Sequence, residues 1–158
     1  ITLTGGEPFI QQSSLALFLY KLKLIYGDIY IEIETNTTIL PLQEFDELIN
    51  QYTCSPKLSN SGMSKEKRYK EDVIKWFVKS PKSIFKFVVS SEKDLSEILL
   101  DFVHPFNIPY KKIYLMPACS NIEELQQKQK WLAELCLEEG FNYSNRLQIQ
   151  IYNLTVGV

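Results

Sequence analysis

Cysteine, net charge and long apolar runs are all scarce in this sequence of 158 residues. The three cysteines, Cys54, Cys119 and Cys136, are odd in number and far apart, which indicates free thiols in a reducing cytosol rather than a disulfide framework. No apolar run approaches the ~20 residues of a membrane span, and residues 1–6 lack the basic region of a signal peptide. With 17 Lys and Arg against 19 Asp and Glu, the net charge of −2 offers no positive surface for nucleic acid or membrane. We therefore expect a cytoplasmic protein with neither partner.

An initiator methionine is also lacking, because the methionines are Met63 and Met116. The sequence opens inside an apolar, strand-like run, so we interpret it as the C-terminal part of a longer protein whose N-terminal strands are missing. Its length and its hydrophobic content of 45% nevertheless suffice for one core. We expect a single domain over residues 1–158.

Helical and strand patterns alternate along the chain, which predicts an α/β fold. A succession of this kind implies parallel strands with right-handed crossovers, in a sheet that is open or part of a barrel. Ser91 with Asp94, and Ser120 with Glu123, are typical of helix starts. Apolar spacing predicts helices over 15–25, 42–49, 64–79, 95–102 and 122–135, and strands over 1–3, 29–33, 84–89, 113–116 and 147–152, with another ending near residue 54.

Polar or turn-forming residues follow most of these strands, at the edge where parallel α/β folds place their ligands. The paired glycines Gly5 and Gly6 allow a ligand to approach the backbone. A carboxylate at Glu7 suits an ammonium group, while Lys57, with the Ser55 hydroxyl near it, suits a carboxylate. Together these groups favour a zwitterionic, amino-acid-like ligand.

Each of these segments also has a purely structural interpretation. A Gly-Gly-x-Pro sequence is often a tight turn, Ser-Pro-Lys is a common loop tripeptide, and Glu34 can be a solvated strand residue. The cysteines and most aromatic residues are typical of a core. The cationic run over 65–70 is typical of a solvated helix face.

Taken in order, however, the segments resemble one family. Leu3 to Pro8 resembles the Gly-Gly-Glu-Pro motif of radical S-adenosylmethionine (SAM) enzymes, and Glu34-Thr35-Asn36 with Thr38 resembles a Glu-Thr-Asn-Gly-Thr strand end found in one branch of them. Cys54 to Leu58, with the run Ser59 to Gly62, resembles the Ser-Pro-Lys segment of 7-carboxy-7-deazaguanine synthases. Residues 87–89, 115–117, 146–150 and 157–158 fit the same family, so the resemblance covers essentially the whole chain.

This resemblance implies an incomplete radical SAM (β/α) barrel that uses SAM, a 4Fe-4S cluster and Mg2+. The implied reaction converts 6-carboxy-5,6,7,8-tetrahydropterin to 7-carboxy-7-deazaguanine with loss of ammonia, on the route to queuosine and related 7-deazapurines. It makes the protein a carbon-nitrogen lyase. The implied partners are the small-molecule pterin substrate, an external electron donor and a second copy in a homodimer.

The resemblance also implies residue roles. Thr4 and the terminal carboxylate of Val158 would contact the substrate, and Gly5, Glu7 and Glu34 fit the SAM pocket chemically. No catalytic side chain and no metal ligand is assigned within this chain. The residues implied to bind SAM are Gly6, Ser55, Pro56, Lys57, Leu115, Met116, Pro117 and Ala118.

Three departures from the family pattern limit the expected activity. The Cys-x3-Cys-x2-Cys cluster motif is absent, residue 37 is Thr where the pattern usually has Gly, and residues 152–155 replace a usual Trp-Gly-Asn-Lys run. We therefore expect the chain as written to be inactive alone. Two alternatives remain: another radical SAM enzyme of the activase type, or a SAM-binding or scaffold protein that has no cluster.

Overall fold

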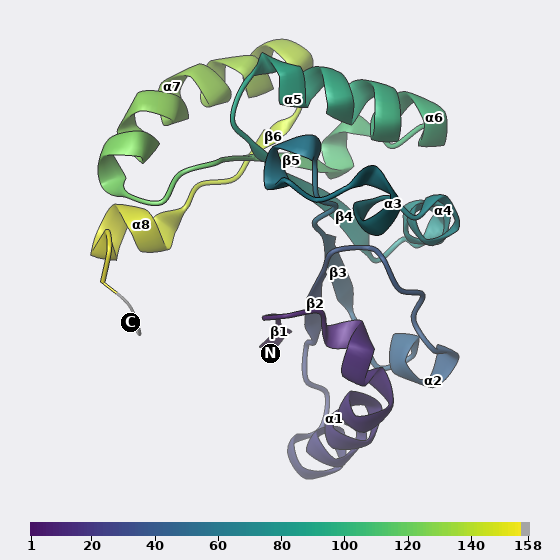
Figure 1. Cartoon of the computed structure of the whole chain (residues 1–158). Coiled ribbons are helices and arrows are strands. Elements are labelled where there is room, and N and C mark those ends of the chain that lie inside the picture. Colours follow the sequence, from purple (N-terminus) through teal and green to yellow (C-terminus); the bar gives the residue numbers. More distant parts are fainter. Residues whose placement is uncertain (156–158) are drawn as a thin grey trace. The chain divides into compact units, whose positions relative to one another are not determined.

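The computed structural model describes residues 1–155 and divides into two compact units (Figure 1). Unit 1 comprises Ile1–Pro56 and Ser64–Ile84; unit 2 comprises Lys57–Met63 and the chain from Phe85 onward. The strands follow chain order, β1 to β6, in an open sheet with parallel neighbours within each unit. This confirms the predicted parallel α/β fold. Within the described residues, no helix has the length and apolar character required to cross a membrane.

Unit 1 contains three strands that alternate with helices. The register pairs Thr2 of β1 with Glu32 of β2, and Glu32 with Gln51 of β3. Along β2, Ile33 and Thr35 are buried while Glu32 and Glu34 are half-buried on the opposite face. The elements are β1 (Thr2–Leu3), a 3-10 turn (Pro8–Gln11), α1 (Gln12–Tyr26), β2 (Glu32–Thr35), α2 (Gln43–Asp46), β3 (Gln51–Cys54), α3 (Lys65–Arg68) and α4 (Glu71–Lys79).

Aromatic side chains build the core of unit 1. The ring centroids of Phe9 and Phe45 lie 5.6 Å apart, and those of Tyr52 and Phe77 lie 5.3 Å apart, both pairs edge-on. These four side chains are at most 2% exposed. Because edge-on pairs add favourable electrostatics to area burial, the cluster fixes how β3 packs against α2 and α4.

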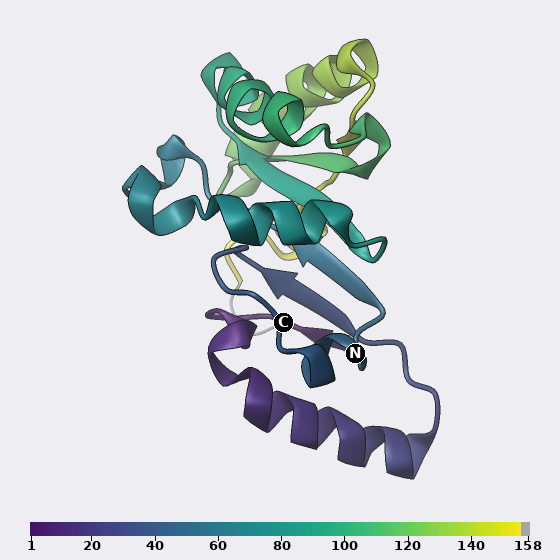
Figure 2. The same ribbon diagram turned by 90° about the vertical axis from the view of Figure 1, so that its right-hand side faces the viewer.

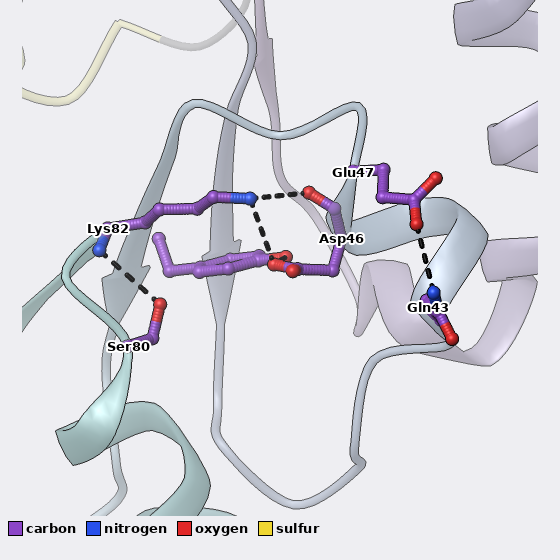
Figure 3. A network of polar contacts seen from close by, with 6 residues as sticks. Gln43, Asp46, Glu47, Ser80 and Lys82 are labelled. Carbon is purple, nitrogen blue, oxygen red and sulfur yellow. Dashed lines mark hydrogen bonds and ion pairs between the residues drawn. The ribbon is translucent and has the colours of Figure 1, made fainter.

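One buried hydroxyl in this core has a charged acceptor. The Tyr52 hydroxyl donates to Asp46 Oδ1 (2.7 Å), and Lys82 Nζ donates to the backbone oxygen (2.7 Å) and Oδ1 (3.2 Å) of Asp46 (Figure 3). Figure 3 also shows the Lys82 amide donating to Ser80 Oγ. Burial, and then the Asp46 carboxylate, raise the pKa of Tyr52, so it remains a neutral donor. We call Tyr52, Asp46 and Lys82 the clamp, because these residues tie β3, α2 and the start of β4 (Ser83–Val89) together.

Unit 2 contains the remaining strands and the 18-residue helix α7. The register pairs Phe85 of β4 with Ile113 of β5, and Tyr114 with Asn142 of β6. Helix α7 packs on β5 and β6 (Figures 1 and 2). The elements are a 3-10 turn (Ser59–Ser61), β4 (Ser83–Val89, from Phe85 onward), α5 (Glu92–Glu97), a π-helical segment (Ile98–Val103), α6 (His104–Phe106), a 3-10 turn (Tyr110–Lys112), β5 (Ile113–Pro117), α7 (Ile122–Glu139), β6 (Asn142–Tyr143) and α8 (Leu147–Tyr152).

The strand predicted over residues 147–152 is wrong, because this segment forms helix α8. Its alternating apolar pattern mimics a strand, yet only Ile149 is buried. The edge of β5 is already occupied by β6, and Asn142 Nδ2 holds that strand by donating to the backbone oxygens of Lys111 and Ile113. A short alternation of apolar and polar residues predicts a strand, but it cannot show that the edge of β5 is already paired with β6.

Other predicted boundaries also shift. The helix predicted over 64–79 divides into α3 and α4 at Tyr69, whose backbone is extended (φ −116°, ψ 111°). Arg68, expected on a solvated face, is buried. The capping box of Ser91 and Asp94 is confirmed, but the N-cap of α7 is Asn121 rather than Ser120, since the Asn121 side chain accepts from the Glu124 amide.

The clamp predicts a specific order of stability losses. Asp46→Ala leaves the buried Tyr52 hydroxyl without its acceptor, so we expect the free energy of unfolding to fall by about 2 kcal/mol. Tyr52→Phe removes donor and hydroxyl together, so the loss should be smaller, about 1 kcal/mol. Urea denaturation followed by circular dichroism measures both. Asp28→Ala, at an exposed carboxylate, is the matched control, and equal midpoints for Asp46→Ala and Asp28→Ala would contradict the assignment.

Candidate functional site

The residues predicted to bind ligands are divided between the units. Thr4, Gly5, Gly6, Glu7, Glu34, Ser55 and Pro56 belong to unit 1, while Lys57 and Leu115 to Ala118 belong to unit 2. Val158 lies outside the described residues. In each unit these residues lie in or next to strand ends, as the sequence predicted.

The turn after β1 exposes its backbone. Gly5 and Gly6 have φ values of +84° and +59°, in the left-handed region that favours glycine. A Cβ built on either glycine would meet no protein atom within 4 Å. The glycines are therefore not required by packing, and the space beside them is open to a ligand.

Glu7 fastens this turn to the end of β2. Its side chain is buried, and Oε1 accepts from Thr35 Oγ1 (2.9 Å) and the Phe9 amide (3.3 Å), while Oε2 accepts from the Asn36 amide (2.8 Å). Charge-assisted bonds of this kind satisfy a buried carboxylate. The geometry makes Glu7 a positioning group for the glycine turn.

The chain after β2 has a backbone that suits glycine, although the residue is Thr37. Its φ is +61° and its side chain is fully buried, an unfavourable conformation for a β-branched residue. Nearby bonds hold it: the Thr37 amide donates to Thr35 Oγ1, and Asn36 Oδ1 accepts from both the amide and the hydroxyl of Thr38. The departure of Thr37 from the family pattern therefore leaves a glycine-type turn intact.

A polar strip lies on the face of β2 opposite the core side chains. The Thr4 hydroxyl donates to Glu34 Oε2 (2.9 Å), and the Thr53 hydroxyl donates to Glu32 Oε1 (2.5 Å). Both carboxylates are half-buried and face away from Ile33. Glu32 and Thr53 were not predicted as site residues, although the period of two along β2 places Glu32 beside Glu34. Such oxygens can accept from the N–H groups of a ring.

Ser55 continues the edge at the end of β3. Its amide donates to the Thr35 backbone oxygen (2.7 Å), which extends the β2–β3 ladder by one residue. Ser55 is half-buried, and Pro56 is buried. The Ser55 hydroxyl therefore stands at the same strand edge as Thr35.

The segment that begins at Lys57 is anchored within unit 2. Glu97 accepts from the amide and hydroxyl of Ser59, and Asn60 Nδ2 donates to the Val88 backbone oxygen (3.0 Å) and Asp94 Oδ2 (3.0 Å). The polar run after Ser-Pro-Lys is thus a structural anchor, which fixes the position of the backbone that follows the exposed Lys57.

Two cations that the sequence analysis missed organise the end of β5. Arg146 Nε donates to the Pro117 oxygen (3.0 Å), and Lys128 Nζ donates to the Ala118 oxygen (2.6 Å). Leu115 and Pro117 are buried, so Met116 presents the side chain on the opposite face of the strand. No short-range pattern links Arg146 to Pro117, because the two residues lie on separate elements.

The thiols show no arrangement suited to a cluster. Cys54 and Cys136 are buried, and burial raises the pKa of the Cys136 thiol to about 11, so it stays protonated at neutral pH. Burial also raises the pKa of the half-buried Cys119, although Arg146 opposes this. Among residues 1–155 no group of three or more His, Cys, Asp or Glu side chains could hold a metal ion.

Sequence comparison finds several relatives that share one name. The 7-carboxy-7-deazaguanine synthase of Pyrobaculum aerophilum is 32% identical over 153 residues, covering 96% of this chain and 64% of the relative. Those of Rhodopirellula baltica and Clostridium acetobutylicum are 30% and 36% identical, covering 95% and 77% of this chain and 60% and 53% of the relatives. The chain therefore spans less than two thirds of the length of these relatives. No protein-family model matches it.

Comparison with solved structures finds proteins that share the fold of this chain. Streptococcus suis SuiB bound to S-adenosylmethionine matches with a TM-score of 0.60 over 92% of this chain and 37% of that protein, at 16% identity. SuiB bound to the precursor peptide SuiA matches with a TM-score of 0.56. At this identity the likeness concerns the fold alone.

The bonds of Glu7 generate a prediction on stability. In Glu7→Gln one carboxylate oxygen becomes an amide that faces an N–H or O–H donor, so we expect a loss of about 1–3 kcal/mol in the free energy of unfolding. Urea denaturation measures the loss. Glu138→Gln, on the exposed side of α7, is the isosteric control and should change little. An unchanged midpoint for Glu7→Gln would show that the carboxylate does not hold the turn.

Proposed function

The chain belongs by sequence to the 7-carboxy-7-deazaguanine synthase family, and on that premise we propose that it forms the SAM- and substrate-binding part of a radical SAM enzyme. The proposed reaction converts 6-carboxy-5,6,7,8-tetrahydropterin to 7-carboxy-7-deazaguanine with loss of ammonia. The observation that carries the proposal is the 32% identity that extends over 96% of the chain. Because the chain spans only part of these relatives, this activity concerns the complete enzyme.

The open glycine turn supports a SAM site. Unhindered backbone beside Gly5 and Gly6 suits the amino-acid end of SAM, and Lys57 would pair with its carboxylate. The likeness in fold to SuiB, whose structure contains SAM, is consistent with this. SAM supplies the radical chemistry when bound, and the protein's task is to orient it.

The remaining predicted contacts would come from strand ends. Ser55 and Pro56 would line SAM after β3, and Leu115 to Ala118 would do so after β5. Since Leu115 and Pro117 are buried, we propose that this segment acts through its backbone and Met116. Arg146 and Lys128 position that backbone by holding two of its oxygens.

Thr4 would contact the pterin substrate at the end of β1. Its hydroxyl is oriented by its bond to Glu34, and the Glu34 carboxylate can accept from N–H groups of the pterin ring. Val158, by the family resemblance, would offer its terminal carboxylate. The roles of Thr4 and Glu34 are binding and orientation.

The described residues do not fit a 4Fe-4S cluster or Mg2+ ligand set, so no step is assigned through either group in this chain. In this proposal, cluster, Mg2+ and electron donor belong to the complete enzyme. The proposed role of this chain's own residues is to bind and orient SAM and the pterin substrate.

Calorimetric titration tests the proposal directly. We expect SAM and 6-carboxy-5,6,7,8-tetrahydropterin each to bind the chain under anaerobic conditions. Binding of SAM without the pterin would instead favour another radical SAM enzyme. Binding of neither would overturn the proposal.

Gly6→Ala tests the backbone approach with a matched control. A Cβ at Gly6 occupies the open space beside the turn, so we expect SAM affinity to fall at least about tenfold. Gly27→Ala is the control, because Gly27 has φ +78° and a Cβ there also meets no atom within 4 Å. Both variants place a side chain at a positive φ, so circular dichroism first checks that each is folded, and equal SAM affinities would then exclude Gly6 from the site.

Reconstitution tests the expected inactivity of the chain alone. Three cysteine thiolates normally hold a cluster of this superfamily, and the cysteines here are buried or half-buried on separate elements. After anaerobic treatment with iron and sulfide, we expect no stoichiometric cluster by absorbance and no SAM cleavage on reduction. Formation of one cluster per chain would prove this expectation wrong.

A further inference from the structure

The polar strip on β2 contains a carboxylate to which the proposed function gives no role. Glu32 lies two residues before Glu34, so the two side chains share one face of the strand, and both are half-buried. Helices α2 and α4 of unit 1 pack against the other face, where Tyr52 contacts Asp46 of α2 and Phe77 of α4 (Figures 1 and 2). Glu32 therefore belongs to the same ligand-facing side of the strands as Glu34.

Two hydrogen bonds orient the Glu32 carboxylate. Its Oε1 accepts from Thr53 Oγ1 (2.5 Å) and from Gln51 Nε2 (3.4 Å), and the Tyr30 hydroxyl orients that amide by donating to its Oε1 (3.0 Å). In the β2–β3 register the residue opposite Glu32 is Gln51. Thr53 instead lies opposite Glu34, nearer the carboxyl ends of the strands. The bond to Thr53 thus directs the Glu32 carboxylate toward the edge at which the glycine turn lies.

The second oxygen of this carboxylate is available to a ligand. Both described hydrogen bonds of the Glu32 side chain end on Oε1, so Oε2 keeps its lone pairs. A carboxylate whose other oxygen is already fixed can accept from an N–H group without rearrangement. Hydrogen bonds to an ionised acceptor are also about twice as strong as those between neutral groups.

We propose that Glu32 is a specificity-determining residue that accepts from the 2-amino group of the pterin substrate. This inference rests on the proposed function. With SAM beside Gly5 and Gly6, the reduced ring that reacts lies at that edge, and the aminopyrimidine ring that the product retains is directed along β2 away from it. Glu34 and Glu32 are about 6.6 Å apart along the strand, which suits the two fused rings of a pterin. A carboxylate at this place favours an N–H donor and repels a carbonyl oxygen.

Two ligands compared on the unmodified chain test this assignment. Calorimetric titration under anaerobic conditions measures the affinity for 6-carboxy-5,6,7,8-tetrahydropterin and for its 2-oxo analogue, in which oxygen replaces the amino group. We expect the pterin to bind at least about tenfold more tightly, because the analogue loses a charge-assisted bond and places an oxygen against the carboxylate. Equal affinities would overturn the inference and leave the proposed function intact, whereas binding of neither ligand would overturn both.

Glu32→Gln assigns the discrimination to this side chain. The amide keeps an oxygen for Thr53 and Gln51 and offers an N–H group to a carbonyl, so we expect pterin affinity to fall about 10- to 100-fold and the preference over the 2-oxo analogue to disappear. Circular dichroism and SAM affinity should stay at their wild-type values. Glu138→Gln, an exposed isosteric change on α7, is the matched control and should keep the preference.

The preference between the two ligands separates a binding role of Glu32 from a structural one. A folded Glu32→Gln that keeps the wild-type preference, or that loses affinity equally for both ligands, would contradict the assignment. If this variant does not fold, the comparison of the two ligands on the unmodified chain still decides whether the site reads the 2-amino group.

Discussion

A single buried carboxylate holds the first two strand ends of unit 1 together. Glu7 accepts hydrogen bonds from a side chain and a backbone amide at the end of β2, and from the amide of Phe9 in its own turn. Because the carboxylate is buried, the loss of any one of these donors would leave its charge with fewer hydrogen bonds and no water to replace them. The geometry of the glycine turn follows from this constraint, and so does the accessibility of its backbone.

Unit 2 uses the same principle with the charges reversed. There, cations hold carbonyl oxygens: Arg146 binds that of Pro117 and Lys128 that of Ala118. Each unit thus fixes the backbone of a strand end with a charged side chain from elsewhere in the chain. Backbone held in this way is suited to binding, since a ligand meets groups that need no rearrangement.

Much of this arrangement could be predicted from the sequence, and the exceptions share a cause. Periodicity located most helices and strands, and the motif residues do lie at strand ends. The strand predicted over 147–152 was wrong because its edge partner was already taken by β6, a tertiary fact that no local pattern contains. Arg146 and Glu32 were missed for a similar reason, as their roles depend on partners in other elements.

The left-handed backbone at Thr37 bears on how such chains are found by sequence comparison. A motif written as a string of amino acids rejects this chain at position 37, where glycine is usual. A motif written as a string of backbone dihedral angles accepts it, because φ there is +61°. In this chain the positive φ is held by neighbouring hydroxyls and amides rather than by the freedom of a glycine, so residue identity at position 37 does not by itself report the conformation of the turn.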